Sequence, residues 1–552
     1  MRIMKRIIAL ISVATLLGLF TGGCDFFNLE MTEDPDAVVL NDANPDYALN
    51  AMQMDFKNFL NDDDPANWNG VNKFGMEVVR MFNIWGGTYE NAYNPQDFDN
   101  LWGYAYEGLL MDAETFLPVY EEKEWWIHAG ITRILQAYTL ATLVDFFGKV
   151  PWSESFDATN FNPVADDDEQ LYDVAIAKLD EAIEDLSREA LAIPSNDLFY
   201  DGDPVAWTTL AKTLKLKIYL NMRLVDPSGA TSMINSLIAD GDLINDPSQD
   251  FYFPYSRNTD NPDSRHPYFT YNYLNGGNDY MANYFMWTLY EEKSVVDPRI
   301  RYYFYRQALV SSEDFQELPC YGVDRPAHYP VDMPYCTLND GYWGRDHLDD
   351  DGIPPDTRKR TLWGVYPAGG EFDSDIGLPG SASSGLQGAG AEVIILDSYV
   401  KFMLAEAALT LGTTGDPKGL LLEAVEASIS YVMAFGEAVA VEEYVPTQED
   451  IDAYLAEVAT LYDEAATEDD KLEVIVKEYY IALFGNGVES YNLVRRTTMP
   501  SNLQPALDAS PGEFTRTFNY PAICVNLNSS IPQKTTNAEQ VFWDTNPAGV
   551  IH

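Results

Sequence analysis

The chain has 552 residues, and its 34 basic against 87 acidic side chains give a formal net charge of −53. Such a polyanion repels phosphate groups, which disfavours nucleic-acid binding and electrostatic attachment to an anionic membrane. With 46% hydrophobic and 13% aromatic residues, the chain is too apolar for an acidic disordered protein. The composition therefore indicates a globular protein, and any membrane attachment must be hydrophobic or covalent.

The start of the chain has the pattern of an export signal. A basic segment, Met1–Arg6, precedes the apolar run Ile7–Phe20, which is too short to span a membrane. A Gly-Gly pair then leads to Cys24, as at a lipoprotein processing site where the cysteine is acylated. We expect a signal peptide over residues 1–23 and a lipid on Cys24; ordinary cleavage that leaves a free cysteine is the alternative.

Hydrophobic residues recur at helical spacing in two blocks, residues 38–242 and 397–490. Glycines and prolines mark several helix ends, and the short connections indicate stacked antiparallel helix pairs. The expected helices are Pro45–Leu60, Glu124–Phe147, Leu171–Leu186 and Pro204–Leu224 in the first block, and Ser398–Leu411, Pro417–Phe435, Gln448–Tyr462 and Asp469–Phe484 in the second.

Residues 243–396 lie between the blocks and are dense in Gly, Pro, Asp and Tyr, without a sustained helical period. An irregular segment of this size far exceeds normal loop length, and long irregular segments in compact proteins are usually functional. The sequence predicts a mainly α protein with little β structure. Its helices form a scaffold, 243–396 is an insert on the ligand side, and 491–552 is a C-terminal irregular segment.

Common catalytic signatures are absent from the sequence. There is no GxxxxGK[ST], strand-led GxGxxG, GxSxG or HExxH motif, and the chain has only five histidines. Paired carboxylates could serve a glycosidase, but with 87 acidic residues almost every pocket will contain some. The residues alone therefore give little support for a catalytic site, and no catalytic residue is assigned.

Carboxylates gather in the segment Gly344–Asp356. One interpretation is a charged surface turn with Arg345 as a local ion partner. The other is an oxygen-ligand site for a structural, calcium-like ion, although the spacing does not match an EF-hand. The ligands of such an ion would be Asp346, Asp349, Asp351 and Asp356. The protein otherwise requires no cofactor.

Two cysteines, Cys320 and Cys336, lie in a segment rich in Pro and Tyr. In an exported protein they could close a disulfide loop worth about 3 kcal/mol by chain entropy. A disulfide and two free thiols remain open as alternatives. A zinc site is rejected because the Cys320, His328 and Cys336 spacing does not match zinc-ligand pairs.

Aromatic residues gather with Asn, Asp and Arg in two segments, residues 80–93 and 278–290. Ring faces can stack on sugar C–H faces while polar neighbours bind hydroxyls, which favours a carbohydrate ligand; for each ring, burial in the core is the alternative. The candidate ligand contacts are Arg80, Trp85, Tyr89, Asn91, Tyr280, Tyr284, Trp287 and Trp343.

Several pieces of the chain, in order, resemble the SusD/RagB family of outer-membrane lipoproteins. Arg133–Tyr138 followed by Leu143–Pro151 resembles a family signature. Asp297–Arg299, Tyr399–Ala407 and Glu478–Gly487 then follow in the family's order. Together with the lipoprotein start, the resemblance covers nearly the whole chain.

The resemblance implies one domain over residues 24–552, built from tetratricopeptide-like helix pairs with a large irregular insert. It implies a non-enzymatic protein, lipid-anchored in the outer membrane at the surface of a Gram-negative bacterium. Such a protein captures an oligosaccharide and passes it to a SusC-like TonB-dependent transporter. RagB-like relatives suggest peptide cargo as an alternative, and an anchored glycoside hydrolase is a further one.

Overall fold

A computed structural model describes residues 44–62, 69–157, 159–277, 279–352 and 354–551. The chain divides into two units, residues 1–47 and 48–552. The predicted signal peptide and Cys24 lie outside the described residues. The second unit contains nearly all of the described elements, and each contact below lies within it.

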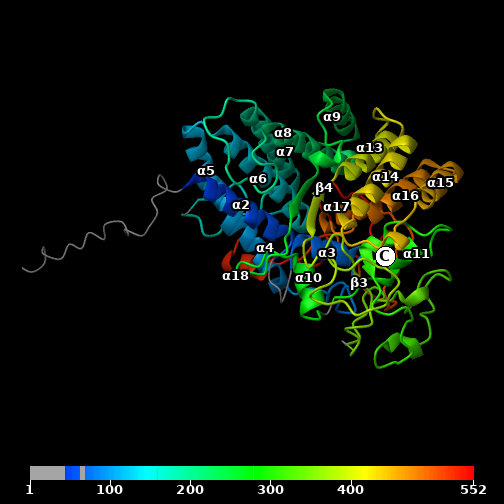
Figure 1. The fold of residues 1–552 in the computed structure, drawn as a ribbon. Coiled ribbons are helices and arrows are strands. Elements are labelled where there is room, and N and C mark those ends of the chain that lie inside the picture. The colour runs from blue at the N-terminus through cyan, green and yellow to red at the C-terminus, as the bar shows by residue number, and fades with distance from the viewer. Residues whose placement is uncertain (1–43, 63–68, 158, 278, 353, 552) are drawn as a thin grey trace, which may run out of the picture. The chain divides into compact units, whose positions relative to one another are not determined.

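The first group of helices is coloured blue to green in Figure 1. Its members are α2 (Pro45–Leu60), α3 (Val71–Val78), α4 (Asp99–Gly103), α5 (Met111–Glu122), α6 (Trp126–Phe147), α7 (Asp168–Leu186), α8 (Pro204–Asn221) and α9 (Pro227–Asp240). From α5 to α9, each helix packs against the next one along the chain. The four helices predicted in this block are confirmed, with end shifts of at most a few residues.

Local sequence signals explain where these helices begin. The Asp203 carboxylate accepts a hydrogen bond from the Val205 amide at 2.8 Å, and Pro204 occupies the first helical position of α8. The helix α6 is apolar almost all round, and its residues from Ile127 to Phe147 are buried. It is therefore the central helix of this group.

The second group of helices is coloured yellow to orange in Figure 1. It contains α13 (Asp397–Leu411), α14 (Pro417–Gly436), α15 (Gln448–Glu464), α16 (Glu468–Ala482) and α17 (Gly487–Thr497). The first four confirm the predicted helices. The predicted end of the block at residue 490 is wrong, because α17 continues to Thr497. Its polar sequence concealed a helix whose side chains, including Arg495 and Arg496, are buried among hydrogen-bond partners.

Short elements occupy the insert. They are β1 (Phe251–Pro254), α10 (Pro267–Phe269), α11 (Asn283–Tyr290), α12 (Ile300–Tyr303), β2 (Phe304–Tyr305), β3 (Leu362–Trp363) and β4 (Ala391–Ile395), and α18 (Ala522–Leu527) follows near the C-terminus. β1 pairs antiparallel with β4, and β2 with β3. The predicted disulfide is present between Cys320 and Cys336, which decides between the two alternatives for these cysteines.

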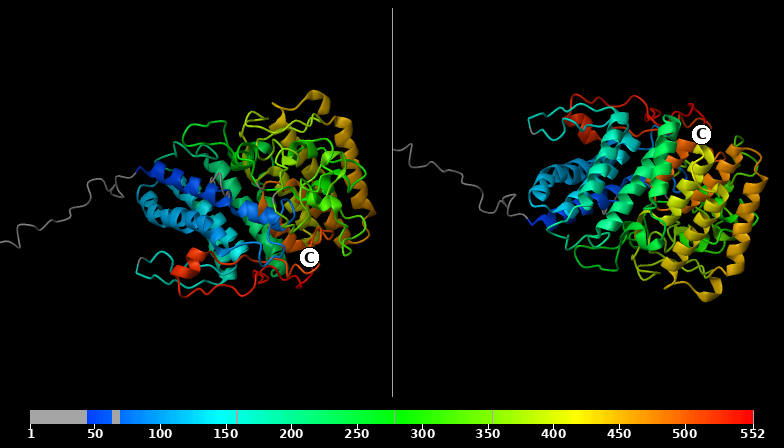
Figure 2. Two further views of the ribbon diagram at one scale, coloured as in Figure 1. Left: turned by 90° about the horizontal axis from the view of Figure 1, so that it is seen from below. Right: turned by 90° about the horizontal axis from the view of Figure 1, so that it is seen from above.

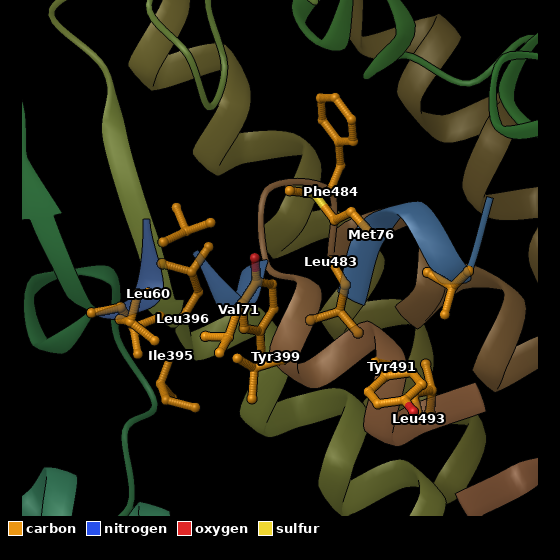
Figure 3. Packing of buried hydrophobic residues seen from close by; sticks show 14 of the residues in the cluster. Leu60, Val71, Met76, Ile395, Leu396, Tyr399, Leu483, Phe484, Tyr491 and Leu493 are labelled. Atoms are coloured by element: carbon orange, nitrogen blue, oxygen red, sulfur yellow. The ribbon is translucent and has the colours of Figure 1, made fainter. Parts of the chain in front are cut away.

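The two helix groups share one core. Helix α13 packs against α8 and α9, and the view from above in Figure 2 shows the cyan-to-green helices beside the yellow-to-orange ones. α3 packs against α17 so closely that a Cβ on Gly75 would lie 2.1 Å from the Gly487 carbonyl oxygen. Figure 3 shows side chains from both groups and from β4 meeting in this core, among them Leu60, Val71, Met76, Ile395, Tyr399, Phe484 and Leu493.

Candidate functional site

The Trp85 ring is half-buried in the loop after α3. Gly86 and Gly87 follow with φ of 112° and 70°, values that favour glycine. A Cβ on Gly86 would lie 2.6 Å from the carbonyl oxygen of exposed Asn91, and a Cβ on Gly87 would lie 2.9 Å from the Asp350 carboxylate. The turn therefore places Trp85 close to Asn91 and Asp350.

Three side chains from the insert support the Trp85 ring. The Tyr280 ring meets it edge to face, with 5.9 Å between centroids. The Arg345 guanidinium lies 5.4 Å from the Trp85 centroid and 4.7 Å from the Tyr280 centroid, and the Arg360 guanidinium lies 4.5 Å from the Tyr280 centroid. We call Trp85, Tyr280, Arg345 and Arg360 the Trp85 cluster.

Carboxylates and backbone carbonyls fix the two guanidinium groups of the Trp85 cluster. Arg345 donates to the Asp349 carboxylate at 3.0 Å and to the Gly352 carbonyl at 2.8 Å. Arg360 donates to the Gly277 carbonyl and, at 3.4 Å, to the Asp356 carboxylate. Each arginine is thereby held in one position over the rings.

Each guanidinium group of the Trp85 cluster is paired with one carboxylate. Burial raises the pKa of Asp349 and of Asp356, while Arg345 and Arg360 respectively lower them. Burial also raises the pKa of Tyr280 to about 12, so its hydroxyl stays protonated and donates to Asp356 at 2.8 Å. Two guanidinium groups thus face two carboxylates beneath the Trp85 ring, and the exposed carboxylate of Asp350 adds a negative charge beside it.

Only part of the predicted ligand set lies at this surface. Trp85 and Asn91 do, whereas Tyr280 is fully buried beneath Trp85 and acts as its support. The prediction of direct ligand contact is corrected for five residues, whose side chains are buried: Arg80, Tyr89, Tyr280, Tyr284 and Trp343. Their polar atoms and rings contact other buried groups instead.

The buried candidates have defined partners. Arg80 donates to the Tyr89 hydroxyl at 2.9 Å, and that hydroxyl also lies 2.9 Å from His347 Nε2. The Tyr284 hydroxyl donates to the Asn502 side-chain oxygen at 3.0 Å. Trp343 packs against the Cys320–Cys336 disulfide region. These contacts make the residues part of the insert's internal structure.

Trp287 lies apart from the Trp85 cluster. Its side chain is 8% exposed and borders a cavity of about 580 Å³, together with His328, Met333 and Phe514. The sequence grouped Trp287 with Tyr280 because they are close along the chain. The structure places them at different sites, so Trp287 remains a candidate only for its own cavity.

The four carboxylates predicted as calcium ligands do not converge on one point. Asp346 accepts hydrogen bonds from Asn283, Gln504 and the Cys336 amide. The other three behave separately: Asp349 pairs with Arg345, Asp356 accepts from Tyr280, and Asp351 is exposed. Within the described residues, no group of three or more His, Cys, Asp or Glu side chains is arranged to hold a metal ion. Arg345 is the local ion partner that the charged-turn alternative expected, but Asp346, Asp349 and Asp356 are buried and not at the surface. A bound ion in this segment stays a prediction.

Sequence reasoning missed Arg360 and Asp350 as parts of this site. Arg360 follows Asp356 by four residues, and this spacing was a local signal of an ion pair. The contact between Asp350 and Gly87 joins positions far apart in the chain, and no sequence pattern indicates it.

Two family descriptions match the chain. One, "Starch-binding associating with outer membrane", matches residues 41–326, and the other, "Susd and RagB outer membrane lipoprotein", matches residues 383–540. None of the curated proteins matches the chain.

Solved structures with the same fold are similar over almost their whole lengths. A chitin-binding protein is 17% identical with a TM-score of 0.66, and the match covers 91% of this chain and 100% of that one. A SusD/RagB family protein from Bacteroides thetaiotaomicron is 17% identical with a TM-score of 0.65, covering 92% and 100%. A chitin-binding SusD homolog from Flavobacterium johnsoniae is 18% identical with a TM-score of 0.61, covering 91% and 99%.

The likeness to solved structures confirms the predicted mainly helical, tetratricopeptide-like fold with an irregular insert. One family description alone matches more than half of the residues, and the second matches most of the remaining C-terminal part. The chain therefore belongs to the SusD/RagB family of outer-membrane lipoproteins.

Proposed function

We propose that this protein captures an oligosaccharide at the cell surface and delivers it to a SusC-like TonB-dependent transporter, without cleaving it. The observation that carries the proposal is the half-buried Trp85 ring, held by Tyr280 and Arg345 beside exposed Asn91. A fixed ring face with hydrogen-bonding groups at its edge suits a sugar, whose C–H face is apolar and whose hydroxyls are polar.

Three further observations support the proposal. Some solved structures of the same fold carry names that describe them as chitin-binding. The net charge of −53 and the exposed Asp350 carboxylate beside Trp85 disfavour acidic cargo. The lipid anchor expected on Cys24 would hold the chain at the membrane where a transporter partner sits.

Isothermal titration of the mature protein against neutral oligosaccharides and peptide pools tests the binding step. Trp85→Ala is expected to raise Kd at least about tenfold, the loss typical of a central aromatic contact. Its melting midpoint should fall by less than about 4 °C, because the ring is only half-buried. Trp152→Ala, which removes another half-buried ring, is the matched control and should leave Kd unchanged.

Other outcomes would redirect the proposal. Binding of peptides and of no glycan would replace the cargo with a peptide. Release of shorter sugars by the purified protein would make it an anchored glycoside hydrolase. Failure to co-purify with a TonB-dependent transporter from native outer membranes would contradict the delivery step alone.

A further inference from the structure

A cavity of about 770 Å³ lies between the insert and the start of α15. Its walls come from the end of α11, the chain around α12 and β2, the turn at Asp340, and residues 443–453. Ligand pockets in proteins typically measure about 300–1,000 Å³ and commonly lie where two parts of a protein meet. This cavity shares no lining residue with the Trp85 cluster.

Tyrosine rings form two sides of the cavity. Tyr290 and Tyr444 are both partly exposed. They come from segments far apart in the sequence: Tyr290 ends α11, and Tyr444 lies just before α15. Behind Tyr290 lies the buried Tyr342 ring, 5.0 Å away between centroids. Exposed Val296 and Leu309 add apolar surface at the rim. The Arg301 guanidinium lies 5.3 Å from the Tyr444 centroid, so a sugar ring that stacks on Tyr444 would use the face away from Arg301.

The polar groups of the cavity are held in place from behind. Asp373, which is buried, accepts a hydrogen bond from Arg306 at 2.8 Å and from the Tyr342 hydroxyl at 2.6 Å. Arg301 donates to the Asp373 carbonyl at 3.0 Å and to the Asp375 carboxylate at 2.9 Å. Because these side chains are already fixed, a ligand would bind them at a low cost in conformational entropy.

The charge around the cavity restricts its ligand. Arg301 and Arg306 are engaged by Asp373 and Asp375. Three exposed carboxylates also line the wall: Glu443, Asp340, which accepts a hydrogen bond from Tyr290, and Asp450, which accepts from Thr447. Acidic ligands are therefore repelled, and hydroxyl groups that donate to carboxylates are accommodated.

We propose that this cavity is a second carbohydrate-binding site, which takes a short neutral oligosaccharide with its sugar rings against Tyr290 and Tyr444. This inference rests on the proposed function, since it gives the same class of cargo a second place on the chain. It adds a site that neither the sequence patterns nor the family resemblance indicated.

The second site adjoins the first along the chain. Tyr342 lies in the cavity wall, and Arg345, three residues later, belongs to the Trp85 cluster. Three extended residues span at most about 11 Å, so these two backbone positions lie within that distance of each other. A glycan long enough to contact both sites would bind more tightly than a short one, because the second contact becomes intramolecular.

The test is isothermal titration of the mature protein with hexasaccharides of maltose, xylose and N-acetylglucosamine units, and with pentalysine. For the glycan that binds, Tyr444→Ala is expected to raise Kd at least about tenfold or to remove one of two binding events. Tyr321→Ala removes a half-exposed ring elsewhere in the insert, and as the matched control it should leave binding unchanged. If Tyr444→Ala folds poorly, Arg301→Lys is the second variant. It keeps the positive charge but loses the planar guanidinium group with its fixed donors, and it should weaken binding as well.

The outcomes separate this inference from the proposed function. Loss of glycan binding in Trp85→Ala but not in Tyr444→Ala or Arg301→Lys overturns the second site and leaves the proposed function standing. Loss in Tyr444→Ala alone supports the second site and overturns the role of Trp85. Binding of pentalysine in place of any glycan, or no binding by the panel, overturns both.

Discussion

Helix α6 and the insert segment around Arg299 fill their interiors with different chemistry. The buried face of α6 is mostly apolar, with Ile131, Leu135 and Leu143 each at most 1% exposed. The fully buried Arg299 instead donates to Asp297 at 2.7 Å and to Glu478 at 2.9 Å. When apolar atoms are removed from a core, the free energy of unfolding falls roughly in proportion to the number of atoms lost. When one partner of a buried ion pair is removed, the other charge stays buried without compensation, and the whole cost of burying it is felt. The apolar positions of α6 should therefore tolerate substitutions that Arg299 does not.

The largest effect is expected from Arg299→Met. This substitution leaves Asp297 buried with Glu478 nearby, and the free energy of unfolding in urea should fall by about 3–5 kcal/mol. Arg188→Met is the control, because Arg188 is 39% exposed and pairs with Glu184 at the surface. It should cost less than about 1 kcal/mol. Equal losses of unfolding free energy in the two variants would show that the buried ion pair of Arg299 contributes no more than the surface pair of Arg188.

The next effect concerns the disulfide of the insert. Replacing both Cys320 and Cys336 by Ser removes a cross-link between residues 16 apart and should cost about 3 kcal/mol. Hydrogen exchange should rise in the insert segment 318–345, which packs Trp343 against the disulfide, and should change little in α6. Uniform loss of protection over both regions would mean that the insert unfolds together with the scaffold.

The contrast between the helices and the insert also explains how much of the fold could be predicted from the sequence. The long helices carry a helical period of apolar residues, which predicts their positions to within a few residues. Asp203 with Pro204 before α8 adds a local signal for the start of a helix. Helix α17 is rich in polar residues although it is buried along its whole length, so its end was misplaced.

The candidate site was predictable only in part. Trp85 carried a local signal, the following Gly-Gly turn, and it does lie at the surface. Tyr280 and Trp343 have similar neighbours in sequence but are buried, because burial depends on what distant segments cover. The packing of Arg345 and Arg360 against rings from elsewhere in the chain is likewise set by the tertiary structure.

A smaller, pH-dependent effect is expected at Asp250, where β1 and the start of α13 meet. Burial raises the pKa of Asp250 from 3.8 to about 8, and its Oδ1 accepts a hydrogen bond from the Asp397 amide at 2.6 Å. The folded chain holds this proton more tightly than the unfolded chain does. Asp250 therefore stabilises the fold fully below about pH 4, and this contribution is lost as the pH rises through about 8.

Asp250→Asn keeps the acceptor for the Asp397 amide and removes the titrating group. Urea unfolding between pH 4 and pH 9 should give a flatter profile for the variant, and at pH 9 the variant should be more stable than the natural chain. Parallel profiles for the two proteins would contradict the assigned role of Asp250.

The smallest effect is expected at an exposed helix cap in the scaffold. Thr467 accepts a hydrogen bond from the Asp470 amide at 3.1 Å, and the Asp470 carboxylate accepts from the Thr467 amide at 3.0 Å. Thr467→Ala should lower the free energy of unfolding by about 1 kcal/mol, while Thr467→Ser, which keeps the hydroxyl, should restore most of it. The cost is small because water can bind the freed amide at this exposed position, whereas no water reaches the partners of Arg299. A loss at Thr467 as large as that at Arg299 would therefore remove the distinction between an exposed local helix cap and a buried ion pair.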